Sequence, residues 1–255
     1  MAAALNVTTE QFLAGNDLLA WRRRQLRRGG RSVDLDWLLD LGGGVCWSEL
    51  QRLLLDAEKV VAIDKPLEAL EKLWVLHLEQ SMPLQHLVGV CPWRDVLLEV
   101  SSAALIPRQE TELLVDVALE RVDPDEASYW TDLGTGSGAI AISLAREFIN
   151  ANIMAIDISE EAIKVANVNI NNKKLNNQIQ LRKITLDSIN EKFDLIVSNP
   201  PYLTKKELEN TSYEIKNYEP LIALDGGEDG LNFYRDFSKK INKIMNVNSY
   251  LLLEI

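Results

Sequence analysis

The second half of the chain alternates short apolar runs with amphipathic stretches. Mostly apolar runs that read as buried strands fall at 130–133, 153–158, 179–184, 193–197 and 250–254. Apolar residues at helical spacing occur after Thr111, after Gly138, across 162–170 and across 231–244. Because strands that alternate with helices are joined by crossovers, this order predicts a parallel sheet wrapped by helices. We therefore expect an α/β, Rossmann-like domain over 107–255.

The first half has a different pattern, in which short amphipathic segments are separated by glycines. Residues 1–82 predict a small helical bundle, with a capping box at 8–11 and a helix that begins at Pro66. We expect the core of this bundle to contain its four tryptophans, Trp21, Trp37, Trp47 and Trp74. Residues 83–106, with Pro83, Pro92 and a β-like run at 96–100, predict a strand-bearing connector.

The last residues, 251–255, are Leu-Leu-Leu-Glu-Ile and fall inside an apolar strand pattern. A long apolar strand left at a sheet edge invites aggregation. We therefore expect the last strands of the sheet to be missing from this sequence.

Composition and charge narrow the class of protein. At 255 residues, with 47% hydrophobic and 25% charged residues, the chain is an ordinary globular one, and it has no apolar run of membrane-spanning length. A cytoplasmic protein is expected, with no membrane and no metal. The net charge of −11 argues against a protein that coats nucleic acid, although six arginines between positions 22 and 31 could contact an acidic partner or form a solvated helix face. The only histidines, His77 and His86, and two distant cysteines give no ligand set or catalytic triad.

A glycine-rich loop follows the first strand of the α/β domain. Asp132-Leu133-Gly134-Thr135-Gly136-Ser137-Gly138 opens a helix, and Asp157 ends the next strand, nineteen residues beyond Gly138. Glycines allow a tight turn and close approach of a ligand, and an acid at this spacing can accept both hydroxyls of a ribose. The loop also fits the dinucleotide fingerprint, so an NAD-dependent oxidoreductase competes with an S-adenosylmethionine enzyme, which we favour.

The motif Asn199-Pro200-Pro201-Tyr202 follows the strand at 193–197 and favours methyl transfer. A planar amide or amine nitrogen is a poor nucleophile, so a site must hold its NH2 group with acceptors. The Asn199 side-chain oxygen and the Pro200 carbonyl are two such acceptors, and they also stabilise the positive charge that develops on nitrogen. The prolines fix the backbone and remove donors, while the Tyr202 ring can pack on a flat substrate. Hydride transfer needs no such motif.

Several further segments, in this order, are similar to one family. They are Pro83 to Gly89, Ile106 to Glu112, Asp132 to Gly138, Asn199 to Tyr202, and Tyr218-Glu219-Pro220 through to Arg235. In these segments the chain resembles the HemK/PrmC protein-(glutamine-N5) methyltransferases, which modify class 1 peptide-chain release factors. The resemblance implies a helical N-terminal domain that recognises the release factor, a β-hairpin linker and a class I S-adenosylmethionine-dependent methyltransferase domain. It implies a monomer with no sequence-specific nucleic-acid contact.

The resemblance also implies a role for each motif. Residues 134–138 (Gly134, Thr135, Gly136, Ser137 and Gly138), Asp157 and Asn199 would bind the cofactor, and residues 199–202 would bind the glutamine of a Gly-Gly-Gln loop. Arg108, Glu110 and Glu112 look like a segment that closes over the cofactor. The family's Trp-containing stretch is shortened here to 185–188, so Leu186 or Asp187 would take over the contact to adenine. A glutamine methyltransferase of ribosomal protein L3 and a nucleic-acid exocyclic-amine methyltransferase remain alternatives.

Overall fold

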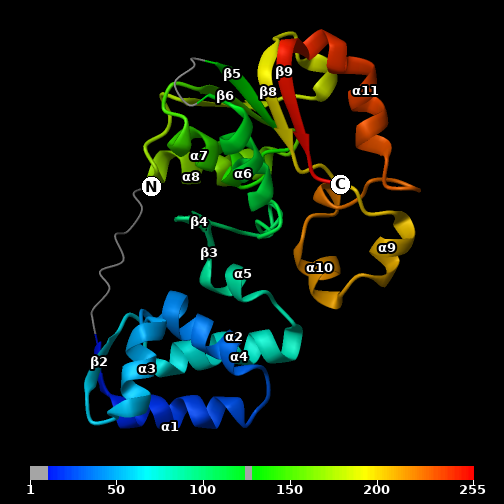
Figure 1. The fold of residues 1–255 in the computed structure, drawn as a ribbon. Coiled ribbons are helices and arrows are strands. Elements are labelled where there is room, and N and C mark those ends of the chain that lie inside the picture. The colour runs from blue at the N-terminus through cyan, green and yellow to red at the C-terminus, as the bar shows by residue number, and fades with distance from the viewer. Residues whose placement is uncertain (1–10, 124–127) are drawn as a thin grey trace, which may run out of the picture. The chain divides into compact units, whose positions relative to one another are not determined.

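The computed structural model describes residues 11–123 and 128–255, and the chain divides into two compact units, Met1–Val88 and Gly89–Ile255 (Figure 1). The capping box expected at 8–11 lies largely outside the described residues. None of the helices in these two ranges is long and apolar enough to cross a bilayer.

The N-terminal unit is built mainly from helices, as its apolar spacing predicts. They are α1 (Gly15–Leu26), α2 (Ser32–Trp37), the π-helical turn η1 (Leu38–Gly42), α3 (Trp47–Leu55), α4 (Leu67–Gln80) and α5 (Leu84–Val88). A short antiparallel pair that the sequence did not predict joins β1 (Gln11–Ala14) to β2 (Val60–Ile63).

The core of this unit contains Trp21 and Trp74, both fully buried, with leucines from every helix around them. Trp37 packs against this core, but the expectation for Trp47 is wrong, because its side chain is 63% exposed. Trp47 is the first residue of α3 and lies one turn before Leu50, where that helix first reaches the core.

Three arginines of the basic cluster are paired with acids of the same unit. Arg22 binds Asp36 at 2.6 Å, Arg28 binds Glu71 at 2.7 Å, and Arg31 binds Asp34 at 2.6 Å. The pairs of Arg28 and Arg31 support the interpretation of a solvated, ion-paired face, whereas the pair of Arg22 is mostly buried.

The C-terminal unit begins with a hairpin of β3 (Val90–Trp93) and β4 (Val96–Glu99). Asn169 fastens this hairpin to the domain, because it is buried and bonds both the N–H and the carbonyl of Glu99, at 2.7 and 2.9 Å. The same carboxamide donates to the carbonyl of Ser137 at 2.9 Å. One side chain of the helix at 160–172 therefore ties the hairpin to the glycine loop.

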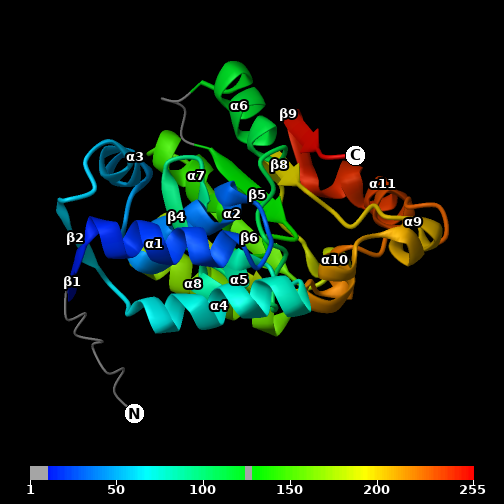
Figure 2. The ribbon, with the colours of Figure 1, turned by 90° about the horizontal axis from the view of Figure 1, so that it is seen from below.

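A five-stranded parallel sheet in the order β7-β6-β5-β8-β9 forms the centre of this unit, which confirms the predicted Rossmann-like class (Figures 1 and 2). Its strands are β5 (Tyr129–Leu133), β6 (Asn152–Asp157), β7 (Ile179–Lys183), β8 (Phe193–Ser198) and β9 (Met245–Leu253). Helices α6 (Glu112–Arg121), α7 (Ala139–Glu147) and α8 (Glu160–Asn172) pack on one face, and α11 (Asn232–Ile244) packs on the other.

Within the described part of this unit, the connections carry four short helices that the sequence did not predict. They are η2 (Leu186–Ser188), α9 (Lys205–Asn210), α10 (Tyr213–Tyr218) and η3 (Leu221–Ala223). The last three lie between β8 and α11, in the segment that follows the Asn-Pro-Pro-Tyr motif. Residues 203–225 therefore form a segment of short helices that lies beyond the end of β8 and outside the sheet (Figure 1).

Candidate functional site

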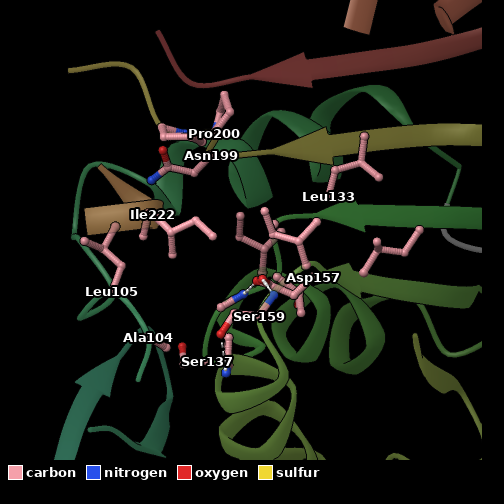
Figure 3. Close-up of a pocket in the computed structure, with 18 of the residues that line it drawn as sticks. Ala104, Leu105, Leu133, Ser137, Asp157, Ser159, Asn199, Pro200 and Ile222 are labelled. Atoms are coloured by element: carbon pink, nitrogen blue, oxygen red, sulfur yellow. Dashed lines mark hydrogen bonds between the residues drawn. The ribbon is translucent and has the colours of Figure 1, made fainter. Parts of the chain in front are cut away.

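A cavity of about 310 Å³ opens beyond the carboxyl ends of β5, β6 and β8 (Figure 3). Its lining combines the glycine loop, the end of β6 and residues 199–201 with two outer segments, 103–108 and 220–223. Ligands of open α/β sheets bind at this edge, and the volume suits a small organic molecule. The cavity therefore lies where the loop and the Asn-Pro-Pro-Tyr motif were predicted to act.

The glycine loop turns sharply between β5 and α7. Gly134, Gly136 and Gly138 have φ angles of 74°, 55° and 86°, in the left-handed region that favours glycine. The N–H groups of Gly134 and Thr135 both donate to the carbonyl of Ile156 at 2.9 Å, which holds the loop against β6. Residues 134–137 line the cavity, but Gly138 lies behind it, where an added Cβ would be 3.4 Å from Ala166 of α8.

Asp157 lies at the end of β6 and faces the loop. Its two carboxylate oxygens accept from the N–H groups of Gly136 at 3.0 Å and Ser159 at 2.9 Å. Ser159, not Asp157, caps α8, because the Ser159 hydroxyl accepts from the N–H of Ala162. A carboxylate with two acceptor directions in use keeps capacity for further donors, so Asp157 can accept hydroxyl groups from the cavity.

Asp132 supports the loop from beneath. It is fully buried, and its Oδ2 accepts from the Thr135 hydroxyl at 2.7 Å and from the N–H of Ala141 at 3.2 Å. Burial raises its pKa to about 7, the neighbouring Asp157 adds to the rise, and the two hydrogen bonds oppose it. Its position within the glycine motif did not indicate that this acid is structural.

Residues 199–202 follow β8 directly. Asn199, Pro200 and Pro201 line the cavity, and Figure 3 shows Asn199 on the side opposite Asp157 and Ser159. The Asn199 amide donates through Nδ2 to the Thr111 hydroxyl at 2.9 Å. Tyr202 is not among the lining residues. Its ring is 37% exposed, and its hydroxyl donates to Glu254 at 3.3 Å.

The outer wall is held by an ion pair between a partly exposed arginine and a buried glutamate. Arg108 Nη2 bonds Glu219 Oε1, and Glu219 Oε2 accepts from the N–H of Ile106 at 3.2 Å. Burial raises the pKa of Glu219, and Arg108 opposes the rise. The pair thus joins the segment 103–108 to the segment 220–223 across the cavity.

Of the three residues that we expected to close over the cofactor, Arg108 alone lines the cavity. Glu110 is exposed, and Glu112 accepts from the N–H of Arg94 in the hairpin at 3.1 Å. The role of Glu219 was missed, although the Tyr-Glu-Pro motif marked its position.

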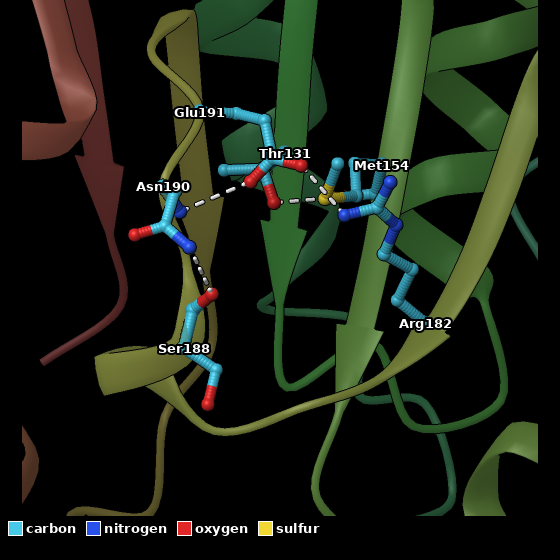
Figure 4. Close-up of polar contacts among 6 residues, drawn as sticks. All are labelled: Thr131, Met154, Arg182, Ser188, Asn190 and Glu191. Carbon is cyan, nitrogen blue, oxygen red and sulfur yellow. Dashed lines mark hydrogen bonds and ion pairs between the residues drawn. The ribbon is translucent and has the colours of Figure 1, made fainter.

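The short stretch after β7 reaches the far end of the cavity through Leu186. Asp187 is not a lining residue, and its carbonyl accepts from Lys240 Nζ at 2.6 Å. Figure 4 shows polar contacts at the two ends of the stretch, where Asn190 Nδ2 donates to the Ser188 carbonyl at 3.3 Å. Arg182 bonds Glu191 at 2.6 Å, and the other Glu191 oxygen accepts from the N–H of Asn190 at 3.1 Å. Leu186 is thus the better placed of the two candidates to cover a flat ring.

The comparisons with known proteins agree with this geometry. The Methyltransferase small domain family matches residues 109–216. The fold, the matched domain and the curated relatives described next define a methyltransferase of the α/β class, which removes the oxidoreductase alternative.

Curated relatives specify the family. A "Release factor glutamine methyltransferase" of Prochlorococcus marinus is 44% identical over 251 residues, which are 96% of this chain and 86% of the relative. A protein of the same name from Synechocystis sp. is 33% identical and covers 96% and 85%. The chain belongs to the release factor glutamine methyltransferase family.

Several solved structures are also similar, and one of them serves as an example. The ribosomal protein L11 methylase from Lactobacillus delbrueckii subsp. bulgaricus has 23% sequence identity and a TM-score of 0.40. The match covers 57% of this chain and 60% of that one.

Proposed function

We propose that this protein transfers a methyl group from S-adenosylmethionine to the side-chain amide nitrogen of a glutamine in the Gly-Gly-Gln loop of class 1 peptide-chain release factors. The observation that carries the proposal is that a single cavity holds the two predicted half-sites. Residues 134–137 and Asp157 lie at one side, and residues 199–201 lie at the other. The relatives' name, release factor glutamine methyltransferase, supplies the substrate class.

The chemistry of the lining suits the cofactor. Asp157 has acceptor capacity for ribose hydroxyls, and Gly134 and Gly136 let the loop backbone come close to a ligand. Apolar groups such as Ile158, Ile184 and Leu186 also line the cavity. Apolar walls with a few placed polar groups are typical of sites for small molecules. When bound, the cofactor supplies a methyl group on a positively charged sulfur.

The chain's own residues would position the amide. The substrate NH2 would donate one hydrogen to the Asn199 side-chain oxygen and the other to the Pro200 carbonyl, which would leave the nitrogen lone pair, perpendicular to the amide plane, free for the methyl group. These acceptors stabilise positive charge as it develops on the nitrogen, and the proton leaves to solvent afterwards. No strong base is needed. Alignment of the two reactants supplies most of the acceleration.

The N-terminal unit would help to hold the release factor, and the hairpin at 90–99 would serve as its linker to the catalytic domain. We infer that the protein acts as a monomer in the cytoplasm, where translation terminates. We also infer that it makes no sequence-specific contact with nucleic acid. Its net charge of −11 supports the last point.

The test is a substrate panel with S-adenosylmethionine labelled in its methyl group. It contains a class 1 release factor, the same factor with its loop Gln→Ala, ribosomal protein L3 and double-stranded DNA. We expect label in the intact release factor only, and tandem mass spectrometry should place it on the loop glutamine. Label in L3 or in DNA would replace the proposal with the corresponding alternative. Label that survives the Gln→Ala change would show that the loop glutamine is not the acceptor and would overturn the proposal.

A further inference from the structure

A chain of hydrogen bonds runs from Asn199 to an acid at the end of the sheet. Asn199 Nδ2 lies 2.9 Å from Thr111 Oγ1, and Thr111 Oγ1 lies 2.7 Å from Glu254 Oε2. The second oxygen of Glu254 accepts from the Tyr202 hydroxyl at 3.3 Å. Thr111 is only 5% exposed, and it also lines the cavity beside Asn199. Neither Thr111 nor Glu254 has a role in the reaction proposed above.

The protons in this chain can be assigned from the donor capacity of each group. An ionised carboxylate only accepts, so the single proton of the Thr111 hydroxyl points to Glu254. The Thr111 oxygen then offers only lone pairs to Asn199. A lone pair must meet a donor, so the NH2 end of the Asn199 carboxamide faces Thr111. Its oxygen must face the other way, into the cavity.

We propose that Glu254 and Thr111 are positioning residues, which fix the orientation of the Asn199 carboxamide so that Oδ1 is presented to the substrate amide. The inference rests on the proposed function. If the carboxamide were flipped, its NH2 group would face the substrate NH2, and two donors cannot bond each other. The acid acts through Thr111, so it polarises the Asn199 amide without touching the substrate.

The fold explains why these groups meet. β8 and β9 are parallel neighbours in which Ser198 pairs with Leu253, so Asn199 and Glu254 leave the sheet at the same edge. The Ser198 carbonyl accepts from the N–H of Glu254 at 3.1 Å, and the Glu254 carbonyl accepts from the Tyr234 hydroxyl at 2.7 Å. The backbone of Glu254 is thus held on both sides. Thr111 is the residue just before α6, and its hydroxyl makes no capping bond to that helix, so it is left for Asn199 and Glu254.

The first test replaces the hydroxyl and keeps the shape. In Thr111→Val the carboxamide is free to flip, so kcat on the release factor should fall roughly 10- to 100-fold, the rate equivalent of one charge-assisted hydrogen bond. The Kd for S-adenosylmethionine should change less than about twofold, because residues 134–137 and Asp157 are untouched. Thr111→Ser keeps a hydroxyl and should recover most of the lost kcat.

A matched control separates this effect from the loss of any buried threonine. Thr131 on β5 is equally buried and donates to the Met154 carbonyl at 2.9 Å within the sheet, as Figure 4 shows. Thr131→Val should leave kcat within about twofold. A similar fall in Thr131→Val and Thr111→Val would mean that packing alone is measured, and would overturn the inference.

The second test reverses the direction of the hydrogen bonds between positions 199, 111 and 254. In Asn199→Asp two carboxylates compete for the one Thr111 proton, and turnover should fall. Adding Glu254→Gln provides an NH2 group that donates to the Thr111 oxygen. The Thr111 proton then points to the carboxylate introduced at position 199. The carboxamide oxygen introduced at position 254 still accepts from the Tyr202 hydroxyl. The double variant should be at least about tenfold more active than Asn199→Asp alone. A double variant that is no more active than Asn199→Asp alone would contradict the inference.

A readout without catalysis keeps the two proposals distinguishable. If the wild-type protein methylates no member of the substrate panel, the proposed function has failed, but the orientation is still measurable by NMR. One side-chain amide proton of Asn199 should exchange slowly in the wild type, and this protection should be lost in Thr111→Val and kept in Thr131→Val. Equal protection in all three proteins would overturn the inference on its own.

Discussion

The buried carboxyl of Asp132 makes the stability of the catalytic unit depend on pH. Its side chain is fully buried, Oδ2 accepts from Thr135 and Ala141, and Oδ1 has no partner among the described residues. Burial, with a smaller contribution from Asp157, raises its pKa to about 7 from an ordinary value of 3.8. The folded protein therefore holds a proton that the unfolded chain has already released at intermediate pH.

The sign and size of the effect follow from this difference in pKa. Between about pH 4 and pH 7 the native state binds more protons than the unfolded state, so the free energy of unfolding falls as the pH rises. Above pH 7 Asp132 is ionised in both the folded and the unfolded state, and the loss of unfolding free energy has reached its full size. A rise of about three units at 1.36 kcal/mol each gives a total on the order of 4 kcal/mol. Asp132→Asn cannot ionise and keeps an acceptor for Thr135 and Ala141, so this component should vanish.

The assay is urea unfolding between pH 4.5 and 8.5 without cofactor, followed by the backbone NMR signals of β5 so that the catalytic unit is observed separately. The stability of Asp132→Asn relative to wild type should increase with pH by several kcal/mol. Asp95→Asn, which removes an exposed carboxylate that pairs with Arg146, corrects for the general loss of one charge. Parallel pH profiles for wild type and Asp132→Asn would refute the reasoning.

Three further changes test the walls of the site. Gly230 has φ +78°, and a Cβ there would lie 2.4 Å from the Tyr202 carbonyl, so Gly230→Ala should displace Tyr202 and lower kcat by roughly tenfold, with cofactor binding by calorimetry nearly unchanged. Asp157→Ala should instead raise the Kd for S-adenosylmethionine by about 10- to 100-fold in the same titration, while kcat at saturation changes less. Arg108→Met leaves Glu219 buried and unpaired, so denaturant unfolding should show a loss of roughly 2–4 kcal/mol, most of which Arg108→Met combined with Glu219→Leu should restore.

The sheet was predictable because its strands are buried on both faces. Runs such as 153–158 and 193–197 are then almost continuously apolar, and the first is followed directly by a helix with apolar residues at helical spacing. The pair β1–β2 is a different case. Phe12 and Val60 are mainly exposed, so no burial pattern marked these short strands. Helix α9 was missed despite a signal, since Thr204 and Glu207 form a capping box.

Part of the candidate site was predictable in the same way, because its residues follow strand ends that lie at one edge of a parallel sheet. The glycine loop, Asp157 and residues 199–201 meet in one cavity for this reason. Thr111 and Glu254 were not predictable as partners. They are 143 residues apart, and their contact depends on the register between β8 and β9 and on the position of α6. Spacing along a sequence carries no information about such pairs.

Asn199 was expected to contact both the cofactor and the substrate, and the proposed reaction requires that its contact with the substrate amide be the one that sets the rate. Asn199→Ala tests this requirement in single-turnover methylation of a release factor with saturating S-adenosylmethionine and a parallel calorimetric titration of the cofactor. We expect a rate at least about 100-fold lower, as for the loss of one group that stabilises developing charge, with a cofactor Kd within about twofold of wild type. A variant that methylates at the wild-type rate, or one that loses cofactor affinity in proportion to its rate, would contradict the proposed role of Asn199.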